Sequence, residues 1–492
     1  MNKFSTSSCN SILVSEELQQ RFASFSGDRN PMHMDRVAAR RTQAGMPVVH
    51  GVHTLLWALE SLISGSFIVS PINRIRVKFL KWVYLGDEAH VGLPNGEATN
   101  PNLLQVEVLG MPVLSAQLRY GEASDEPRGL LMPSPATPLP RALDLSFADL
   151  DGRSGDAFTA APEDAVALFP QLSAVIGATA VAEIAACSYI VGMEAPGLHS
   201  MFSKLDLTIA KPNAPGRVRK ALHYLVTSHD ERFRKACIAV TGHGISGTLD
   251  VFVRVPPVRQ APMEEVGKRV MGSEFQGMNA LVIGGSRGLG ELTAKLIAAG
   301  GGQVTVTYAA GKSEAVEVVE QIVRWGGKAA HIQYDIRQTP EPQLARLIYK
   351  PTHLFYFATS NIYRPKGQLI APSTLAEFSL FYLQGFYDLC KVLIEPGKES
   401  TPGPRRLVAF YPSSVFVEDR PAGMTEYAMI KSAGEQMCRD MNQYLAGLQI
   451  LVKRLPRLPT DQTAGIMPER NIDPIEVLLS VVREMQSLSR SD

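Results

Sequence analysis

Apolar positions in the first quarter of the chain follow two different periods. Residues 52–63 place Leu55, Leu56, Leu59 and Leu62 on one helical face, which predicts a buried helix. Residues 75–79 alternate apolar and polar side chains, and so do residues 104–120 with a break at 110–112, which predicts strands. One apolar helix among strands of alternating polarity indicates an α+β unit.

The same pattern returns after a connecting stretch. Residues 122–156 are rich in Pro, Gly, Ser and Asp, which predicts an extended surface linker. Gly177 then opens a second apolar helix that runs to Val191, and alternating segments follow at 201–209, 221–227, 237–241 and 249–255. The apolar run 176–193 contains Glu183 and several small residues, so we expect a buried core helix and no membrane span.

The last part of the chain has a third pattern. After a mostly polar stretch at 258–275, residues 279–283 are continuously apolar, which predicts a fully buried strand. A glycine-rich loop, an apolar helix from residue 292 and a second strand at 303–308 follow. This order of strand, helix and strand predicts an α/β domain with a parallel sheet.

Composition narrows the class of protein. The 492 residues are 45% hydrophobic and 20% charged with a formal net charge of +1, so several ordinary globular domains are expected and charge indicates neither a nucleic-acid nor a membrane partner. The five cysteines are scattered without a Cys-x-x-Cys pair, which fits a reducing compartment and indicates no metal site. The first twenty residues resemble no signal peptide and the last four are no peroxisomal address, so we expect a cytoplasmic protein.

One short loop carries candidate chemistry. Residues 26–33 read Ser-Gly-Asp-Arg-Asn-Pro-Met-His, so a glycine and a proline fix an irregular backbone around Asp28 and His33. A carboxylate and an imidazole five positions apart can carry protons for one small substrate. The loop, followed by Val48-Val49-His50-Gly51, resembles the motif of the MaoC-like (R)-specific hydratase/dehydratase family, which has the hotdog fold. Every fixed position of Ser-Gly-Asp-x-Asn-Pro-x-His is matched.

The resemblance implies roles for these residues. Asp28 and His33 would hold the catalytic water, or the hydroxyl that leaves in the reverse direction. One of them would remove the proton alpha to a thioester carbonyl while the other protonates the departing oxygen. The backbone N–H of Gly51, at a helix N-terminus, would polarise the thioester oxygen. His50 and His53, beside the start of that helix, are expected to pack or cap and not to catalyse.

The second α+β unit has no counterpart of this loop. There is no room for the motif between Phe169 and Gly177, and His199 has no aspartate at the motif spacing. We therefore expect a degenerate second hotdog. It would complete one active site at the boundary with the first unit and leave room for a longer or bulkier acyl group.

The glycine-rich loop at 284–290 indicates a nucleotide site. Its glycines allow a tight turn and let a pyrophosphate approach the backbone at a helix N-terminus. No acidic residue ends the strand at 303–308, so nothing there would hold both ribose hydroxyls of NAD. Arg287, with Lys312 as a second candidate, would instead meet a 2′-phosphate, which indicates NADP(H).

Further residues complete a reductase pattern. Tyr427 and Lys431 share one helix face, so the ammonium can lower the pKa of the phenol, which can then exchange a proton with a carbinol oxygen. With Ser414 before them and the glycine loop, they resemble the short-chain dehydrogenase/reductase family, especially its beta-ketoacyl reductases. The resemblance implies that Tyr427 is the acid, Lys431 its modulator and ribose ligand, and Ser414 the carbonyl anchor. The implied cofactor-binding residues are Gly284, Ser286, Arg287, Gly288, Leu289, Gly290, Asp335, Ile336, Ala358, Tyr427 and Lys431.

Several positions depart from that family. Ile283 replaces the usual Thr before the glycine loop, and residues 356–359 keep only the alanine of Asn-Asn-Ala-Gly. Tyr382 stands where the family often has the Asn that orders a proton-relay water, and Arg457 replaces the Gly that usually follows Pro456. The proton donor is kept, whereas the relay, loop rigidity and substrate fit differ. The sequence therefore leaves open whether the reductase is specialised, slow or inert.

The two resemblances cover nearly all of the chain and imply consecutive reactions. We predict a double hotdog with a degenerate second half, followed by a Rossmann domain with a doubly wound parallel sheet. The expected parts are a catalytic hotdog at 1–123, a proline-rich linker at 124–156, a degenerate hotdog at 157–257, a connector at 258–276 and the reductase domain at 277–492. The predicted enzyme reduces a 3-oxoacyl thioester with NADPH and dehydrates the product to a trans-2-enoyl thioester, in fatty-acid-like or polyketide-like biosynthesis.

Two alternatives stay open at this point. A beta-oxidation enzyme would join the same two modules in the opposite order and use NAD, as an enoyl-CoA hydratase and (R)-3-hydroxyacyl-CoA dehydrogenase. Alternatively, the reductase-like domain is a non-catalytic scaffold. The sequence leaves open whether CoA or an acyl carrier protein bears the acyl group, and which chain it is. Reductases of this family usually pair, so we expect a homodimer or homotetramer.

Overall fold

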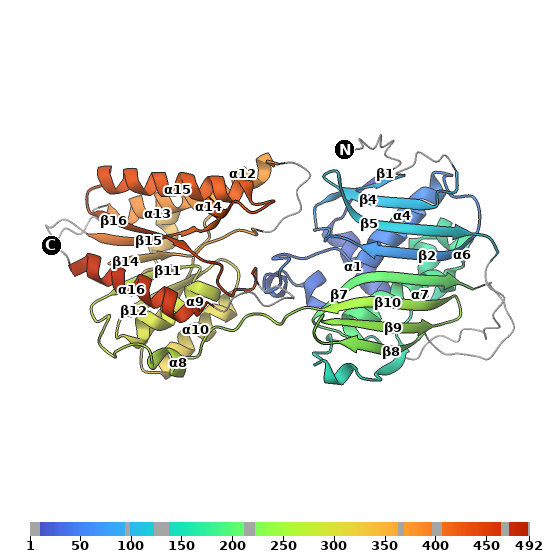
Figure 1. Ribbon diagram of the computed structural model, residues 1–492, viewed down its shortest axis with the longest axis horizontal. Coiled ribbons are helices and arrows are strands. Elements are labelled where there is room, and N and C mark those ends of the chain that lie inside the picture. Colours follow the sequence, from blue (N-terminus) through green and yellow to red (C-terminus); the bar gives the residue numbers. More distant parts are fainter. Residues whose placement is uncertain are drawn as a thin grey trace. The chain divides into compact units, whose positions relative to one another are not determined.

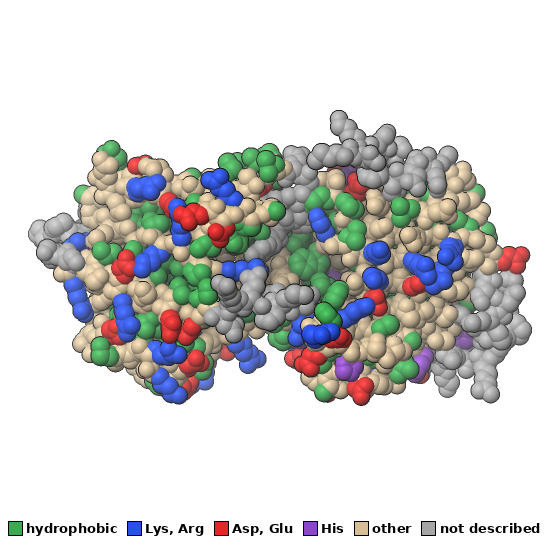
Figure 2. Space-filling model, viewed as in Figure 1, with side chains coloured by type: hydrophobic (Ala, Val, Ile, Leu, Met, Phe, Trp, Pro, Cys, Tyr) green, Lys and Arg blue, Asp and Glu red, His purple; other side chains and the backbone are tan. Residues whose placement is uncertain are grey.

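The chain folds into two units, residues 1–256 and 257–492, which are described separately (Figure 1). The computed structural model describes residues 10–93, 99–122, 137–210, 222–362, 369–395, 406–463 and 472–490. Residues 1–9 with Cys9, which belong to the stretch where no signal peptide is expected, lie outside these residues. So do residues 124–136 of the predicted linker and the last two residues of the chain. Side chains of both charge signs are interspersed on the visible face of each unit (Figure 2).

Unit 1 is built on one ten-stranded antiparallel sheet, with the strand order β1-β3-β4-β5-β2-β7-β10-β9-β8-β6. Its first half carries the long helix α4, whose leucine stripe is buried as predicted. In β2 the side chains of Ile75 and Val77 point into the core while Arg74 and Arg76 point outward, which is the expected period of two. The elements of this half are β1 (Asn10–Leu13), α1 (Glu16–Ser26), α2 (Pro31–Met34), α3 (Arg36–Ala39), α4 (Gly51–Ser64), β2 (Ile72–Phe79), β3 (Glu88–Gly92), β4 (Leu103–Val108) and β5 (Met111–Tyr120).

The second half of unit 1 repeats this plan with α7 as its central helix. Strands β2 and β7 pair antiparallel from Arg74–Thr208 to Lys78–Lys204, and this pairing joins the two halves into one sheet with one continuous core. Its elements are a 3₁₀ turn (Ala148–Leu150), β6 (Ser154–Ala157), α5 (Pro162–Leu168), α6 (Pro170–Ile176), α7 (Ala178–Tyr189), a π-helical turn (Ile190–Glu194), β7 (Ser200–Ile209), β8 (Leu222–Asp230), β9 (Lys235–Thr241) and β10 (Ile245–Val253).

The apolar run around α7 is buried in this core, as expected. Most residues of α7 are inaccessible to solvent, and the Glu183 carboxylate accepts hydrogen bonds from the backbone N–H groups of His243, Gly244 and Ile245. No single described helix is long and apolar enough to cross a membrane. Helix α6 and the segment Ala178–Glu194 reach that length and composition only together, and a bend of 109° separates them.

Unit 2 is a six-stranded parallel sheet with the order β13-β12-β11-β14-β15-β16. Along β11, Ala280 and Val282 enter one core with α9, α10 and α16, whereas Leu281 and Ile283 enter a second core with α13 and α15. Helices therefore cover both faces, and the sheet is doubly wound (Figure 1). The elements are α8 (Met263–Gly267), β11 (Asn279–Ile283), α9 (Gly288–Ala299), β12 (Gln303–Tyr308), α10 (Lys312–Arg324), β13 (Lys328–Gln333), α11 (Pro340–Leu344), β14 (His353–Tyr356), α12 (Pro372–Ser379), a π-helical turn (Leu380–Gln384), α13 (Gly385–Ile394), β15 (Leu407–Ser414), α14 (Phe416–Asp419), α15 (Thr425–Tyr444), β16 (Leu448–Leu455) and α16 (Pro474–Arg490).

Candidate active sites

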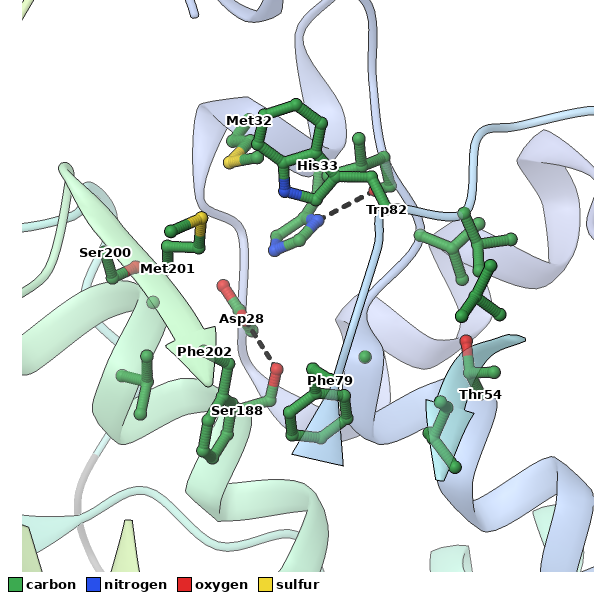
Figure 3. A pocket seen from close by; sticks show the side chains of 18 of the residues that line it. Asp28, Met32, His33, Thr54, Phe79, Trp82, Ser188, Ser200, Met201 and Phe202 are labelled. Atoms are coloured by element: carbon green, nitrogen blue, oxygen red, sulfur yellow. Dashed lines mark hydrogen bonds between the residues drawn. The ribbon is translucent and has the colours of Figure 1, made fainter. Parts of the chain in front are cut away.

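The motif loop of unit 1 is fixed by its own backbone. Helix α1 ends at Gly27, whose φ of 77° is left-handed and suits glycine. The Asn30 side chain then caps α2 by accepting from the backbone N–H of Met32 at 3.0 Å, and Pro31 occupies the first position of that helix. These two devices turn the chain so that Asp28 and His33 face the same cavity (Figure 3).

Asp28 is a buried carboxylate with a defined set of donors. Its Oδ2 accepts from the Ser188 hydroxyl at 2.7 Å and its Oδ1 accepts from the backbone N–H of Asn30 at 3.1 Å. Burial raises the pKa of Asp28, and the nearby His33 and these two hydrogen bonds oppose that rise. A carboxyl with a raised pKa can both give up and recover a proton, which is what general acid–base chemistry needs.

One ring nitrogen of His33 is held by a hydrogen bond, and the other faces the cavity. Its Nδ1 lies 2.8 Å from the carbonyl oxygen of Val48, which only accepts, so Nδ1 carries the proton. The other ring nitrogen, Nε2, faces the cavity that Asp28 lines (Figure 3). The geometry brings together the two proton carriers that the motif predicts.

His50 contacts both members of this pair. It is fully buried, its ring stacks on that of His33 at a centroid distance of 4.0 Å, and its Nε2 donates to the backbone carbonyl oxygen of Asp28 at 3.0 Å. Burial above all, and then the neighbouring His33 and His53, lower the pKa of His50 well below its ordinary value, so the ring is neutral. His50 therefore holds the backbone of Asp28 in place.

His53 and His199, the other two histidines that the sequence analysis considered, are buried. His53 stacks flat on Phe22 at 4.6 Å, and burial lowers its pKa to about 4. His199, in the second half, lies 3.3 Å from a carboxylate oxygen of Asp144, a partner that the motif spacing does not reveal. Donor atoms of Asp28, His33 and His50 lie within 4.8 Å of one another, but the Nε2 of His50 is already engaged with a carbonyl oxygen, so we assign no metal there.

Residues of the second half complete the environment of Asp28, and the sequence analysis did not identify them. Ser188 on α7 supplies the hydroxyl, and the π-helical turn brings Gly192 so close that a Cβ there would lie 2.3 Å from Asp28 Oδ1. The Asn30 amide donates across the same boundary to the carbonyl oxygens of Gly192 at 2.7 Å and Gly197 at 3.1 Å. In the sequence, the one indication of this contact was the hydroxyl of Ser188 in a mostly apolar helix.

The cavity beside Asp28 has a volume of about 80 Å³ and opens to solvent. Gly51 lines it as the first residue of α4, so its N–H belongs to the unpaired helix N-terminus. Most of the other lining side chains are apolar, and Lys81 beside Trp82 adds a positive charge. A mostly apolar lining with a few converging polar groups is typical of a small-molecule binding site.

Unit 2 has the predicted glycine-rich turn between β11 and α9. Gly284 has a φ of 74°, and a Cβ on Gly290 would lie 2.3 Å from the Gly284 carbonyl oxygen, so these glycines allow close packing at the start of the helix. The Gly284 N–H donates to the Thr307 hydroxyl on β12 at 3.0 Å. Side chains at these positions would fill the turn. Because glycines leave it open, it can accept the pyrophosphate of a dinucleotide beside Ser286, Gly288 and the rest of the loop.

Arg287 lies in this loop but is already paired. Its Nη1 is 2.9 Å from Asp461 Oδ2, and Asp461 Oδ1 accepts from the backbone N–H of Val258. Lys312 is the first residue of α10. Binding a 2′-phosphate would therefore require Arg287 to share or leave its carboxylate partner, a requirement that the sequence did not show.

The remaining predicted cofactor residues occupy the carboxyl edge of the parallel sheet. Asp335 follows β13, and its Oδ1 accepts from the backbone N–H of Arg337 at 3.0 Å. Ile336 is buried, and Ala358 follows β14 beside the glycine turn. Ligands bind at this edge in open α/β sheets, so the placement agrees with a nucleotide site.

Tyr427 and Lys431 lie one turn apart on α15, and Ser414 ends β15. The Lys431 Nζ is buried, donates to the Pro412 carbonyl oxygen at 2.7 Å and lies 4.1 Å from the centroid of the Tyr382 ring. Burial lowers the pKa of Lys431 to about 7. The Tyr382 hydroxyl is 2.6 Å from the Thr359 hydroxyl, so it is engaged with the segment that follows β14.

Comparison with known families identifies both units. Residues 5–101 match the family described as MaoC like domain, and residues 278–348 match the family described as short chain dehydrogenase. The chain thus carries a MaoC-like domain in its N-terminal region and a short-chain dehydrogenase domain in its C-terminal region.

Individual relatives match over short stretches. An uncharacterized oxidoreductase of Methylorubrum extorquens is 44% identical over 66 residues, which are 13% of this chain and 27% of that protein. The L-rhamnose 1-dehydrogenase (NADP(+)) of Thermoplasma acidophilum is 40% identical over 62 residues, 13% of this chain and 24% of that one. The chain thus spans about a quarter of the length of these two relatives. A short chain dehydrogenase from Burkholderia cenocepacia, solved with NADP, is 21% identical with a TM-score of 0.35 and covers 43% of this chain and 91% of that one.

Proposed function

Because the chain carries a MaoC-like domain and a short-chain dehydrogenase domain, we propose that it is a bifunctional enzyme of acyl thioester metabolism. Unit 2 reduces a 3-oxoacyl thioester with NADPH, and unit 1 removes water from the 3-hydroxyacyl product to give a trans-2-enoyl thioester. The observation that carries the proposal is the arrangement of Asp28 and His33 on one cavity at the N-terminus of α4. Fatty-acid-like or polyketide-like biosynthesis is the context that fits this direction.

In the dehydratase step the two side chains have distinct roles. The free Nε2 of His33 takes the proton from the carbon alpha to the thioester carbonyl, and the Asp28 carboxyl, whose pKa burial raises, protonates the departing hydroxyl. The Gly51 N–H stabilises the charge that develops on the thioester oxygen. In the hydration direction the same groups act with their proton states exchanged, so ionised Asp28 accepts a proton from water.

We interpret unit 1 as a double hotdog whose second half is degenerate. Each half wraps antiparallel strands around a long helix of its own, α4 or α7, and the two halves meet through β2 and β7. Only the first half has the motif loop, and α6 occupies the corresponding stretch before α7. The second half contributes Ser188 and Gly192, so one active site is formed from both halves.

In the reductase step the hydride for the carbonyl carbon would come from a nicotinamide cofactor held at the glycine turn. Tyr427 donates its phenolic proton to the carbonyl oxygen, Ser414 hydrogen-bonds the same oxygen, and the Lys431 ammonium lies near the phenol at 5.8 Å from its ring centroid. Preference for NADP over NAD is supported by Arg287 in the glycine turn and by the lack of an acidic residue at the end of β12.

A direct test supplies the intact protein with a 3-oxoacyl-CoA and NADPH and identifies the products. Wild type should form the enoyl thioester, Asp28→Asn should stop at the hydroxyacyl stage, and Tyr427→Phe should consume no NADPH. The proposal fails if wild type forms neither hydroxyacyl nor enoyl product, and the dehydratase assignment fails if Asp28→Asn still gives full enoyl product.

A second candidate function makes unit 2 a non-catalytic scaffold for the dehydratase. It is favoured by Tyr382, whose ring covers the Lys431 ammonium that would otherwise serve cofactor and water. Calorimetric titration with NADPH separates the two candidates. Absence of binding supports the scaffold, whereas binding together with oxidation of NADPH by a 3-oxoacyl thioester supports the bifunctional enzyme.

A further inference from the structure

Two aromatic rings from different halves of unit 1 meet inside the dehydratase cavity. Phe79 ends β2 and Phe202 lies near the start of β7, and their ring centroids are 5.0 Å apart (Figure 3). The two strands pair only as far as Lys78 and Lys204, so the rings lie just beyond the last paired residues, where the strands part. They close the space that this parting would otherwise leave between the halves.

Phe79 also covers the position where the thioester would be polarised. A Cβ on Gly51 would lie 2.8 Å from both Cδ1 and Cε1 of Phe79, which means that the ring packs directly on the first residue of α4. A carbonyl oxygen that accepts from the Gly51 N–H is therefore within van der Waals reach of this ring. The carbon atoms next to that carbonyl must pass between the ring and the pair Asp28 and His33.

Side chains of the second half pack the space directly behind the motif loop. A Cβ on Gly27 would meet Phe158 at 2.7 Å and Tyr189 at 3.1 Å, so aromatic side chains fill the space behind the loop. Gly192 packs against the carboxylate itself.

We propose that Phe79 and Phe202 form a wall that restricts the dehydratase site to short acyl chains of crotonyl size. This inference rests on the proposed dehydratase function and names the substrate class of that site. Both rings are half-buried and packed against the common core, so displacing them to admit further methylene groups disturbs that packing. Neither residue belongs to the motif loop, and the sequence analysis assigned them no role.

The wall predicts a steep dependence of activity on chain length. One methylene group in an apolar pocket changes kcat/KM by about 10- to 200-fold. Hydration of crotonyl-CoA should therefore exceed hydration of oct-2-enoyl-CoA by at least about 100-fold in kcat/KM. Phe202→Ala should reduce that ratio by about 10-fold or more, because it opens the wall on the side away from Gly51.

The experiment uses the full chain and two readouts. Hydration is followed by loss of the enoyl absorbance with crotonyl-CoA and oct-2-enoyl-CoA, and binding of the unreactive butyryl-CoA and octanoyl-CoA is measured by calorimetry. Phe67→Ala is the matched control, since Phe67 is equally half-buried against the same core but does not line the cavity. Phe202→Leu, a smaller change, replaces Phe202→Ala if thermal melting shows that the alanine variant is unfolded.

The outcomes separate this inference from the proposed function. The wall is supported if butyryl-CoA binds more tightly than octanoyl-CoA, and if this preference weakens in the Phe202 variant but not in Phe67→Ala. This holds even if no enoyl thioester is hydrated. In that case only the dehydratase proposal fails. Equal affinity for the two saturated thioesters, or a selectivity that the Phe202 variant leaves unchanged, overturns the wall.

Discussion

Replacing Ser188 with alanine should raise the pKa of Asp28 and shift the pH dependence of the dehydratase. The Ser188 hydroxyl donates to Asp28 Oδ2 at 2.7 Å from the other half of unit 1, and both side chains are buried. Burial already raises the pKa of Asp28, and this hydrogen bond opposes the rise. Alanine removes the donor and leaves the ionised carboxylate less stabilised in a buried place.

The size of the shift follows from the type of hydrogen bond. A bond to a charged group contributes about 1.5–3 kcal/mol, and one pKa unit corresponds to about 1.36 kcal/mol. The pKa of Asp28 should therefore rise by about one to two units. Hydration needs ionised Asp28, so the acid limb of the kcat/KM profile should move to higher pH by the same amount.

The free energy of unfolding should also depend on pH through Asp28. The folded-state pKa of Asp28 is raised above its unfolded value, so ionisation of this group lowers the free energy of unfolding as pH rises. Ser188→Ala enlarges that loss. The difference in stability between wild type and variant should be present above the folded-state pKa of Asp28 and disappear as pH falls below it.

The assay compares pH profiles for hydration of crotonyl-CoA. Ser188→Thr keeps a hydroxyl and should restore much of the wild-type profile. Ser173→Ala serves as control, because Ser173 is a buried serine whose hydroxyl has no hydrogen-bond partner in the described part of the chain. An acid limb that stays in place in Ser188→Ala would refute the argument that this bond sets the pKa of Asp28.

Four further outcomes are expected. Asp28→Asn should lower crotonyl-CoA hydration by at least about 100-fold while NADPH-dependent reduction continues, as product analysis would show. Gly192→Ala should destabilise the protein by about 1–3 kcal/mol in denaturant titrations, because a Cβ would lie 2.3 Å from Asp28 Oδ1. Arg287→Ala should reduce the ratio of kcat/KM for NADPH over NADH by about 10-fold or more, since a charge-assisted bond to phosphate is lost. Because burial lowers the pKa of Lys431 to about 7, its positive charge is lost as pH rises through that value, and NADPH affinity measured by calorimetry should fall there.

Local features of the fold could be predicted because local chemistry encodes them. The turn at Gly27 and the proline at position 31 fix the motif loop, and helical or alternating apolar spacing marks α4 and β2. The glycine turn after β11 is equally local. In each case a few neighbouring residues determine the backbone, so the sequence is sufficient.

Contacts between distant segments could not be predicted. Ser188 is 160 positions from Asp28, and Asp461 is 174 positions from Arg287. Neither partner stands in a recognisable motif, and each pair forms only because two packed elements bring it together. The π-helical turn that presents Gly192 has no clear sequence signal either, and the same holds for the two phenylalanines that meet where β2 and β7 part.

Several of these distant contacts join the motif loop to the second half of unit 1. The Asn30 amide, a motif residue, donates to the carbonyl oxygens of Gly192 and Gly197, so the loop is held by the backbone of the other half. Burial of Asp28 depends on the same segment, and burial is what raises its pKa. The motif therefore provides the reactive groups, but the proton affinity of the carboxyl is a property of both halves together. Without the second half, the Asp28 carboxylate would be exposed to solvent, and burial would no longer raise its pKa.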